Sequence, residues 1–387
     1  MSRLRIVLAG GFLASYPEGG GHWMGFLQYL LGLRGLGHDA LWLELLPSSD
    51  DPGRDGGRIE AFFARMQEYG LRECCALLLQ PRSRTEQHML EGAEAYGLSR
   101  GQIEEIVRSA DLLWNFAAAM RPPLLSLFRR RVLIDLDPGH LQVSALTADL
   151  AITAHDAFLT VGSKLHDPDC GVPTLGVTWH RFLPFVHLPL WDATPDPGPA
   201  APITSVTQWT WEELWLGDRV LSVSKRDGYL PYLTLPRRAE RPFELAVNLS
   251  DTDDTGDREL LIDHGWRLTH PHTVAASPAA YQRYIAGSRA EFGCPKPIHR
   301  ALRTGWFSDR SAAYLASGRP VLFEDTGIGE RLPTGKGLLL FCALAEAVEG
   351  VCALDADWPS HARAAREIAE QFLDGRQILR AMLEVSA

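Results

Sequence analysis

Two series of alternating strand and helix patterns, separated by a proline-rich passage, dominate the sequence. In the first series an apolar run at 4–11 ends in glycines, a helical apolar pattern follows at 23–33, and a second apolar run covers 40–46. Continuous apolar runs are typical of parallel strands that are buried on both faces. The alternation restarts at residue 203. The chain is therefore predicted to form tandem Rossmann-like, doubly wound α/β domains.

The proline-rich passage, 188–202, contains five prolines and little periodicity, a composition typical of a linker. We predict a first domain at 1–190, a linker at 191–202, a second domain at 203–365 and a terminal helix at 366–387 that could cross back to the first domain. Among the individual elements, one helix is predicted over 229–235 and another over 277–293. The carboxyl ends of both sheets are expected to face a common cleft.

Composition narrows the function classes. The 38 Lys and Arg residues against 48 Asp and Glu residues give a net charge of −10, which disfavours nucleic acid as a partner. The six cysteines form no Cys-x-x-Cys pair, and free cytosolic thiols are expected. No apolar run approaches the roughly 18 residues that a transmembrane helix requires. A cytoplasmic location without a transmembrane segment is therefore predicted.

A glycine–histidine loop follows the first predicted strand. Gly20 and Gly21 precede His22 at the edge where open α/β sheets bind ligands, and glycine backbones can approach a ligand or a turn closely. His22 could accept a proton from a hydroxyl nucleophile, since an imidazole titrates near neutral pH. In the alternative interpretation the glycines only form the turn and His22 lies on the surface.

A second polar group follows the strand pattern at 131–135. Asp137 begins an Asp-Pro-Gly sequence, and His140 and His155 come next along the same predicted edge. Asp137 could orient a base or bind an acceptor, although Asp-Pro-Gly is also an ordinary turn sequence. No metal site is predicted, because His264, His270 and His272 lack cysteine or carboxylate partners at ligand spacing.

The segment 303–341 contains a predicted anion site. A helix begins at 308, where its free N–H groups would favour negative charge, and an acidic-glycine loop follows the strand pattern at 319–325. In the alternative interpretation this is an ordinary αβ unit with a serine cap. The residues expected around a diphosphate are Ser308, Asp309, Arg310, Ser311, Asp325, Thr326 and Gly327.

The stretch "GWFSDRSAAYLASGRPVLFEDTG", followed by "LPTGKGLLLF", resembles the donor half of GT-B glycosyltransferases. The N-terminal "GGGH" and "GLRGLGHD" likewise resemble the acceptor domain of that family. With "DPG", "KRD" and "SRAEF", the chain is similar to a group of bacterial glycosyltransferase-like proteins. The resemblance implies the GT-B architecture, in which 203–365 binds a nucleotide diphosphate-sugar and 1–190 binds a small-molecule or glycan acceptor.

The resemblance also implies site residues and a reaction that needs no metal or bound cofactor. Positive charge at the diphosphate would stabilise the leaving group. The candidates for this charge are Lys225 or Arg226, Arg289 and Lys296, while Trp209 could lie against the base or sugar. Retaining members carry a glutamate where this chain has Ala313, so Asp309 or Glu324 would approach the donor instead. If His22 is the base, the reaction inverts the anomeric centre.

Two alternatives remain open at the level of sequence. A sugar-nucleotide 2-epimerase shares the predicted fold, and a non-catalytic nucleotide-binding protein would close around the same ligand. A requirement for a free acceptor separates a transferase from an epimerase. The pattern specifies neither the donor base and sugar nor the oligomeric state.

Overall fold

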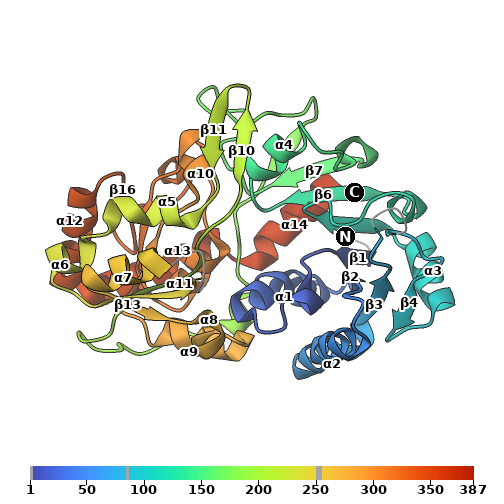
Figure 1. Ribbon diagram of the computed structural model, residues 1–387, viewed down its shortest axis with the longest axis horizontal. Helices are drawn as coiled ribbons and strands as arrows, with labels where there is room; N and C mark the ends of the chain where they lie inside the picture. Colours follow the sequence, from blue (N-terminus) through green and yellow to red (C-terminus); the bar gives the residue numbers. More distant parts are fainter. Residues whose placement is uncertain (1–2, 84–86, 250–254) are drawn as a thin grey trace.

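The computed structural model describes residues 3–83, 87–249 and 255–387. These residues form two large sheets and a small hairpin, each large sheet being flanked by helices (Figure 1). This arrangement shows the predicted α/β class with doubly wound sheets.

The first sheet is eight-stranded over the described residues, in the order β4-β3-β2-β1-β5-β6-β7-β8. Its neighbours pair in parallel except for the antiparallel edge strand β4. Because β1 lies between β2 and β5, the strand order reverses there, which opens a crevice at the carboxyl ends. The strands are β1 (Arg5–Ala9), β2 (Asp39–Pro47), β3 (Cys75–Gln80), β4 (Glu94–Tyr96), β5 (Leu112–Phe116), β6 (Arg131–Asp135), β7 (Ala157–Thr160) and β8 (Trp179–Arg181).

Helices follow the strands of the first sheet as the periodicity predicted. They are α1 (Gly20–Gly35), α2 (Pro52–Glu68), α3 (Arg100–Ser109) and α4 (His140–Ser144). Helix α3 begins at a capping box formed by Ser99 and Gln102.

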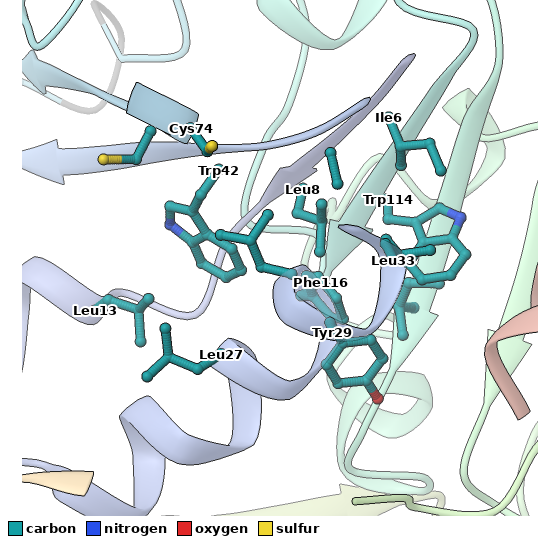
Figure 2. Packing of buried hydrophobic residues seen from close by; sticks show 14 of the residues in the cluster. Ile6, Leu8, Leu13, Leu27, Tyr29, Leu33, Trp42, Cys74, Trp114 and Phe116 are labelled. Carbon is teal, nitrogen blue, oxygen red and sulfur yellow. The ribbon is translucent and has the colours of Figure 1, made fainter. Parts of the chain in front are cut away.

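The molecule has two halves, one built around each large sheet. Helix α1 is apolar on more than one side because it packs against both halves. Leu27 joins the core beneath the first sheet, whereas Met24 joins the core of the second. Figure 2 shows the first of these cores, where Tyr29 lies edge-on to Phe116 with ring centroids 4.9 Å apart. The position of α1 therefore couples the two halves.

The second sheet is all parallel, and its order over the described residues is β13-β12-β9-β14-β15-β16. The order reverses between β9 and β14, which defines a second crevice. A hairpin of β10 (Glu213–Leu216) and β11 (Arg219–Ser222) follows β9. The sheet strands are β9 (Ile203–Gln208), β12 (Phe243–Asn248), β13 (Trp266–Thr269), β14 (Ala290–Gly293), β15 (Val321–Glu324) and β16 (Leu338–Phe341).

The helices of the second half surround this sheet, and the last one returns to the first half. Helix α14 packs against α1 and β7, beside which it is drawn in red in Figure 1. The helices are α5 (Lys225–Tyr229), α6 (Leu235–Ala239), α7 (Thr255–Asp263), α8 (Pro271–Val274), α9 (Pro278–Ala286), α10 (Pro297–Ala301), α11 (Asp309–Ala316), α12 (Leu344–Ala356), α13 (Trp358–Phe372) and α14 (Gly375–Ser386).

Two predicted helices differ from the observed elements. The helix predicted over 277–293 ends at Ala286, and 290–293 forms strand β14, because complete burial between β9 and β15 outweighs its helix-forming residues. The helix predicted over 229–235 is divided between α5, a short 3₁₀ turn containing Pro231, and α6.

Candidate functional site

The glycine–histidine loop joins β1 to α1 and presses against the second half. The N–H of Gly20 donates to the carbonyl of Ala275 at 2.8 Å. A Cβ atom on Gly20 would lie 2.3 Å from the carbonyl oxygen of Ser277, and one on Gly21 would lie 3.2 Å from the ring of Tyr281. The N–H of Gly20 is therefore taken up by a protein carbonyl, as in the alternative interpretation in which the glycines form the turn. The glycines let α1 approach the α8–α9 segment.

His22 stands at the first turn of α1 with its ring between two aromatic rings. Its centroid is 5.6 Å from that of Tyr16 and 5.1 Å from that of Phe26. Nε2 contacts the carbonyl oxygen of Gly11, an acceptor, so Nε2 carries the proton and Nδ1 keeps its lone pair. Desolvation lowers the pKa of His22. The contact with the Gly11 carbonyl and the carboxylate of Asp309 raise the pKa, but they do not outweigh the desolvation. A neutral imidazole with a free Nδ1 can accept a proton.

Asp137, beyond the end of β6, joins the two halves. Its Oδ2 contacts Lys296 Nζ and lies 3.3 Å from His140 Nδ1, and its Oδ1 lies 3.3 Å from His299 Nε2. Burial alone would raise the pKa of Asp137, but the Lys296 ammonium and the two imidazoles hold it well below its usual range. The structure brings Asp137, His140 and Lys296 together, whereas His22 has Gly11 as its partner instead.

The conformation of the Asp137 loop depends on Asp135, the last residue of β6. The Asp135 carboxylate accepts hydrogen bonds from Gln142 at 2.8 Å, from Thr160 at 2.7 Å and from the N–H of Asp137 at 3.0 Å. Burial raises the pKa of Asp135 to about 6 despite these hydrogen bonds. Asp135 is thus a buried anchor that directs Asp137 toward the second half.

His299 and Trp306 form a stacked pair beside Asp137. Their ring centroids are 4.5 Å apart with an interplanar angle of 5°. The indole N–H of Trp306 donates to the carbonyl of Leu136 at 3.1 Å, which fixes the pair against the first half. Burial lowers the pKa of His299 to about 4, so the ring is neutral at pH 7. Neither residue was a site candidate from sequence, although both flank the motifs that were.

Lys225, the first residue of α5, also lies against the Trp306 ring. Its Nζ lies 5.0 Å from a Trp306 ring centroid and donates to the carbonyl of Cys294 at 2.7 Å. Burial, followed by the positive charges of Arg310 and Lys296, lowers the pKa of Lys225 to about 7. Three cations therefore gather at the carboxyl edge of the second sheet, where a bound anion would relieve their repulsion.

The N-terminus of α11 completes this cluster, here called the cation cluster (Lys225, Lys296 and Arg310). The serine cap of the alternative interpretation is present, because Ser308 Oγ accepts from the N–H of Arg310 at 3.2 Å. Arg310 is anchored by Glu291 at 2.5 Å and by the carbonyl of Val206 at 2.8 Å. Arg310 Nη2 and Ser311 Oγ are buried without a partner among the described residues. An unpaired buried donor is unfavourable, so both donors, like the unpaired Glu291 Oε2 beside them, call for a polar partner that the described residues do not supply.

Comparisons with known proteins bear on the architecture of two doubly wound sheets. No model of a protein family matches the sequence, and no curated protein matches it. Solved structures do match over nearly the whole chain. An alpha-glucosyltransferase in complex with UDP and a 13-mer DNA is 9% identical, with a TM-score of 0.61 and 99% coverage of both chains. HepE of Anabaena in complex with UDP and glucose is 12% identical, with a TM-score of 0.57 and 99% coverage of both.

A third match is a sucrose-phosphate synthase from Thermosynechococcus elongatus, 12% identical with a TM-score of 0.55, covering 99% of this chain and 98% of that one. These structures are GT-B glycosyltransferases. The chain has the GT-B fold. The resemblance noted in the sequence is thus confirmed at the level of fold.

Three predicted donor residues lie elsewhere in this GT-B fold. Trp209 is 1% exposed and its indole N–H donates to Asp257 at 2.8 Å, so its ring is enclosed in the core. Arg289 precedes β14 and pairs with Asp196 at 2.6 Å, which places it at the amino end of that strand, opposite the cation cluster. Arg226 also pairs with Asp257.

The acidic-glycine loop lies in a contact between the halves of the GT-B fold. The Asp325 carboxylate accepts from the N–H of Gly327, and Thr326 donates to the carbonyl of Trp306 at 2.7 Å. A Cβ atom on Gly327 would lie 2.5 Å from Lys164 Cδ. Lys164 therefore covers the turn that the sequence suggested for phosphate.

Three further candidates have distinct surroundings. Glu324 is buried and paired with Arg300 and the Tyr232 hydroxyl. His155 is buried, with both ring nitrogens in contact with polar groups of the first half. Asp309 is exposed, and its carboxylate would lie 2.9 Å from a Cβ atom on Gly25 of α1, next to His22. Asp309 is thus the candidate that approaches the glycine–histidine loop.

A metal-binding cluster and a membrane-spanning helix are both absent from the described residues. No group of three or more His, Cys, Asp and Glu side chains there is arranged to hold a metal ion. No helix in the described ranges combines the length and apolarity needed to cross a bilayer.

Proposed function

We propose that this chain is a glycosyltransferase that moves a sugar from a nucleotide diphosphate-sugar to an acceptor hydroxyl. The observation that supports the proposal most directly is the cation cluster. The cluster lies at the crevice of the second sheet. Burial, together with the positive charges of Arg310 and Lys296, lowers the pKa of Lys225 to about 7. Such a cluster is stabilised when a dianionic diphosphate binds. UDP is the first nucleotide to test, because HepE and the alpha-glucosyltransferase are solved with it.

The leaving group would be stabilised by side chains. As the bond between the anomeric carbon and the diphosphate oxygen breaks, its electron pair moves onto the diphosphate. Lys225, Lys296 and the free Nη2 of Arg310 would meet that negative charge, and Ser311 Oγ would donate to it. Because these groups supply the positive charge, we propose that transfer proceeds without a metal ion.

The proton of the acceptor hydroxyl needs a base on the first half. His22 fits this role, because its Nε2 is held by the Gly11 carbonyl and its lowered pKa keeps Nδ1 unprotonated. Nδ1 would take the proton as the acceptor oxygen forms its bond to the anomeric carbon. Such an in-line attack inverts the anomeric centre.

We assign Asp137 a positioning role. Its carboxylate contacts Lys296 and His299 across the cleft, and Trp306 stacks on His299 next to Lys225. Asp137 thereby fixes the position of the cluster relative to the first half. His140 lies on the same carboxylate and helps to hold it.

Thermal shift and turnover test the proposal in sequence. The purified chain is heated with UDP, dTDP, GDP or ADP in EDTA, and a native-state ligand raises the melting temperature by mass action. Lys225→Met should abolish the shift, whereas Lys336→Met, at an exposed lysine, should retain it. Absence of any shift would refute the donor site.

Turnover is then measured with the sugar nucleotide of the responding base and a panel of acceptors. Transfer in EDTA that depends on the acceptor supports an inverting transferase once the product anomer is determined. Binding without turnover on any acceptor would indicate a non-catalytic nucleotide-binding protein.

A further inference from the structure

A groove separate from the candidate site runs between α14 and the β7–β8 region. Its volume is about 400 Å³. The residues that line it are distinct from the cation cluster and from His22. They are Leu159, Ser163, Arg181, Phe182, Leu183, Arg331, Ile378, Ala381, Met382 and Val385.

The long wall of the groove is one face of α14. Ile378, Ala381, Met382 and Val385 are spaced at i, i+3, i+4 and i+7, which places them in one stripe along the helix. The stripe extends over residues 378–385, seven steps along the helix, or about 10 Å at the rise of an α-helix. Phe182 and Leu183 supply apolar surface of the groove from the segment after β8. An extended apolar chain matches this shape.

The polar part of the groove carries excess positive charge. Arg181 and Arg331 both pair with the carboxylate of Asp167, at 2.7 Å and 2.5 Å. Two guanidinium groups therefore share one carboxylate, and the other lining side chains are uncharged. The side chains of Arg181 and Arg331 remain 41% and 34% exposed, so a ligand can reach them. A single negative charge on the ligand would balance the site.

We propose that this groove binds a single-chain amphipathic anion. Its apolar chain would lie along α14 and its carboxylate or phosphate would meet Arg181 and Arg331. Arg331 belongs to the second half, whereas Arg181 and α14 pack with the first, so the ligand would contact both halves. The same chemistry occurs in free fatty acids and in membrane lipids, and the test separates these sources.

The first arm uses sodium decanoate, decyl phosphate and neutral 1-decanol, with calorimetry and thermal shift on the full chain. The two anions should bind saturably, and decanol should bind more weakly. Ala381→Trp places an indole in the groove from an exposed position and should weaken anion binding at least tenfold. Glu384→Trp, at a nearby exposed position on α14 outside the groove, is the matched control and should bind normally.

The second arm measures sedimentation with phosphatidylcholine vesicles that contain phosphatidylglycerol. Binding that Ala381→Trp abolishes supports the proposal, and the responding arm identifies a free amphiphile or a membrane lipid. Arg331→Gln should weaken the binding of the two anions without affecting the binding of decanol. The UDP-induced rise in melting temperature should persist in both tryptophan variants, which shows that they are folded. Failure of binding in both arms, equal binding by the two tryptophan variants, or decanol binding as tightly as decanoate would overturn it.

Discussion

The ammonium group of Lys225 lies 5.0 Å from a ring centroid of Trp306, and the ring of His299 stacks on the same indole. This relationship links the cation cluster to Asp137, because His299 Nε2 faces the Asp137 carboxylate. The candidate donor site and the first half are therefore connected through one aromatic side chain. An indole face tolerates a desolvated cation better than an aliphatic wall does, which explains how Lys225 is kept here.

The affinity for a nucleotide diphosphate should fall as the pH rises above 7. Burial, then Arg310 and Lys296, holds the pKa of free Lys225 at about 7, and a bound dianion raises it. Binding above pH 7 therefore takes up a proton, and Kd should weaken by up to about tenfold per pH unit. Calorimetry of UDP binding at pH 7, 8 and 9 in two buffers measures both effects. A wild-type UDP affinity that does not change between pH 7 and pH 9 would contradict this assignment.

The same lysine should reduce stability at low pH. Its folded pKa of about 7 lies below the unfolded value of about 10.4, so the unfolded state binds more protons between these values. Stability linked to Lys225 thus rises from pH 7 to pH 10 and is lowest below pH 7. Lys225→Met should raise Tm by roughly 1–4 °C at pH 6, with a smaller gain at pH 9. Calorimetric unfolding at both values tests this, and an equal or lower Tm of the variant at pH 6 would exclude it.

Local sequence patterns predicted many of the strands and helices, but they did not predict which residues contact one another in the site. Apolar runs followed by helical periodicity predicted β1, α1 and β2, and Ser308 signalled the start of α11. Strand β14 was missed because Ala290 and Glu291 favour helices, and only burial between two neighbouring strands makes the segment extended. Tertiary context decided that segment.

The sequence predicted where along the chain the candidate site residues lie, but not which of them are in contact. Asp137 and Lys296 are separated by 159 residues, and no spacing rule connects them. His299 was missed because a lone histidine in a short helix gives no signal until Trp306 stacks on it. Gly20 was recognised as unusual, but the reason, the nearby Ser277 carbonyl, belongs to the other half. Such contacts arise only from the packing of both halves.

Substitution of Gly20 by alanine should destabilise the protein. The added Cβ would meet the Ser277 carbonyl at 2.3 Å, and backbone atoms cannot turn aside as a side chain can. We expect a loss of roughly 1–3 kcal/mol in the free energy of unfolding. Gly56→Ala in α2 is the matched control, since its Cβ meets nothing within 4 Å, and it should stabilise by up to about 1 kcal/mol. Denaturant unfolding compares them, and equal effects would refute the packing role of Gly20.

Removal of the His22 imidazole should slow transfer while leaving donor binding intact. The described contact of His22 is with the Gly11 carbonyl and not with the cation cluster, so His22→Asn should bind UDP with wild-type affinity. Loss of the proton acceptor should lower kcat by roughly 10²- to 10⁴-fold. Because desolvation lowers the pKa of His22, wild-type kcat should fall only below the usual imidazole range as the pH decreases. Steady-state kinetics with a saturating donor measures both. A variant that keeps wild-type kcat would remove His22 from the reaction and direct the search for a base to Asp309, the neighbouring carboxylate.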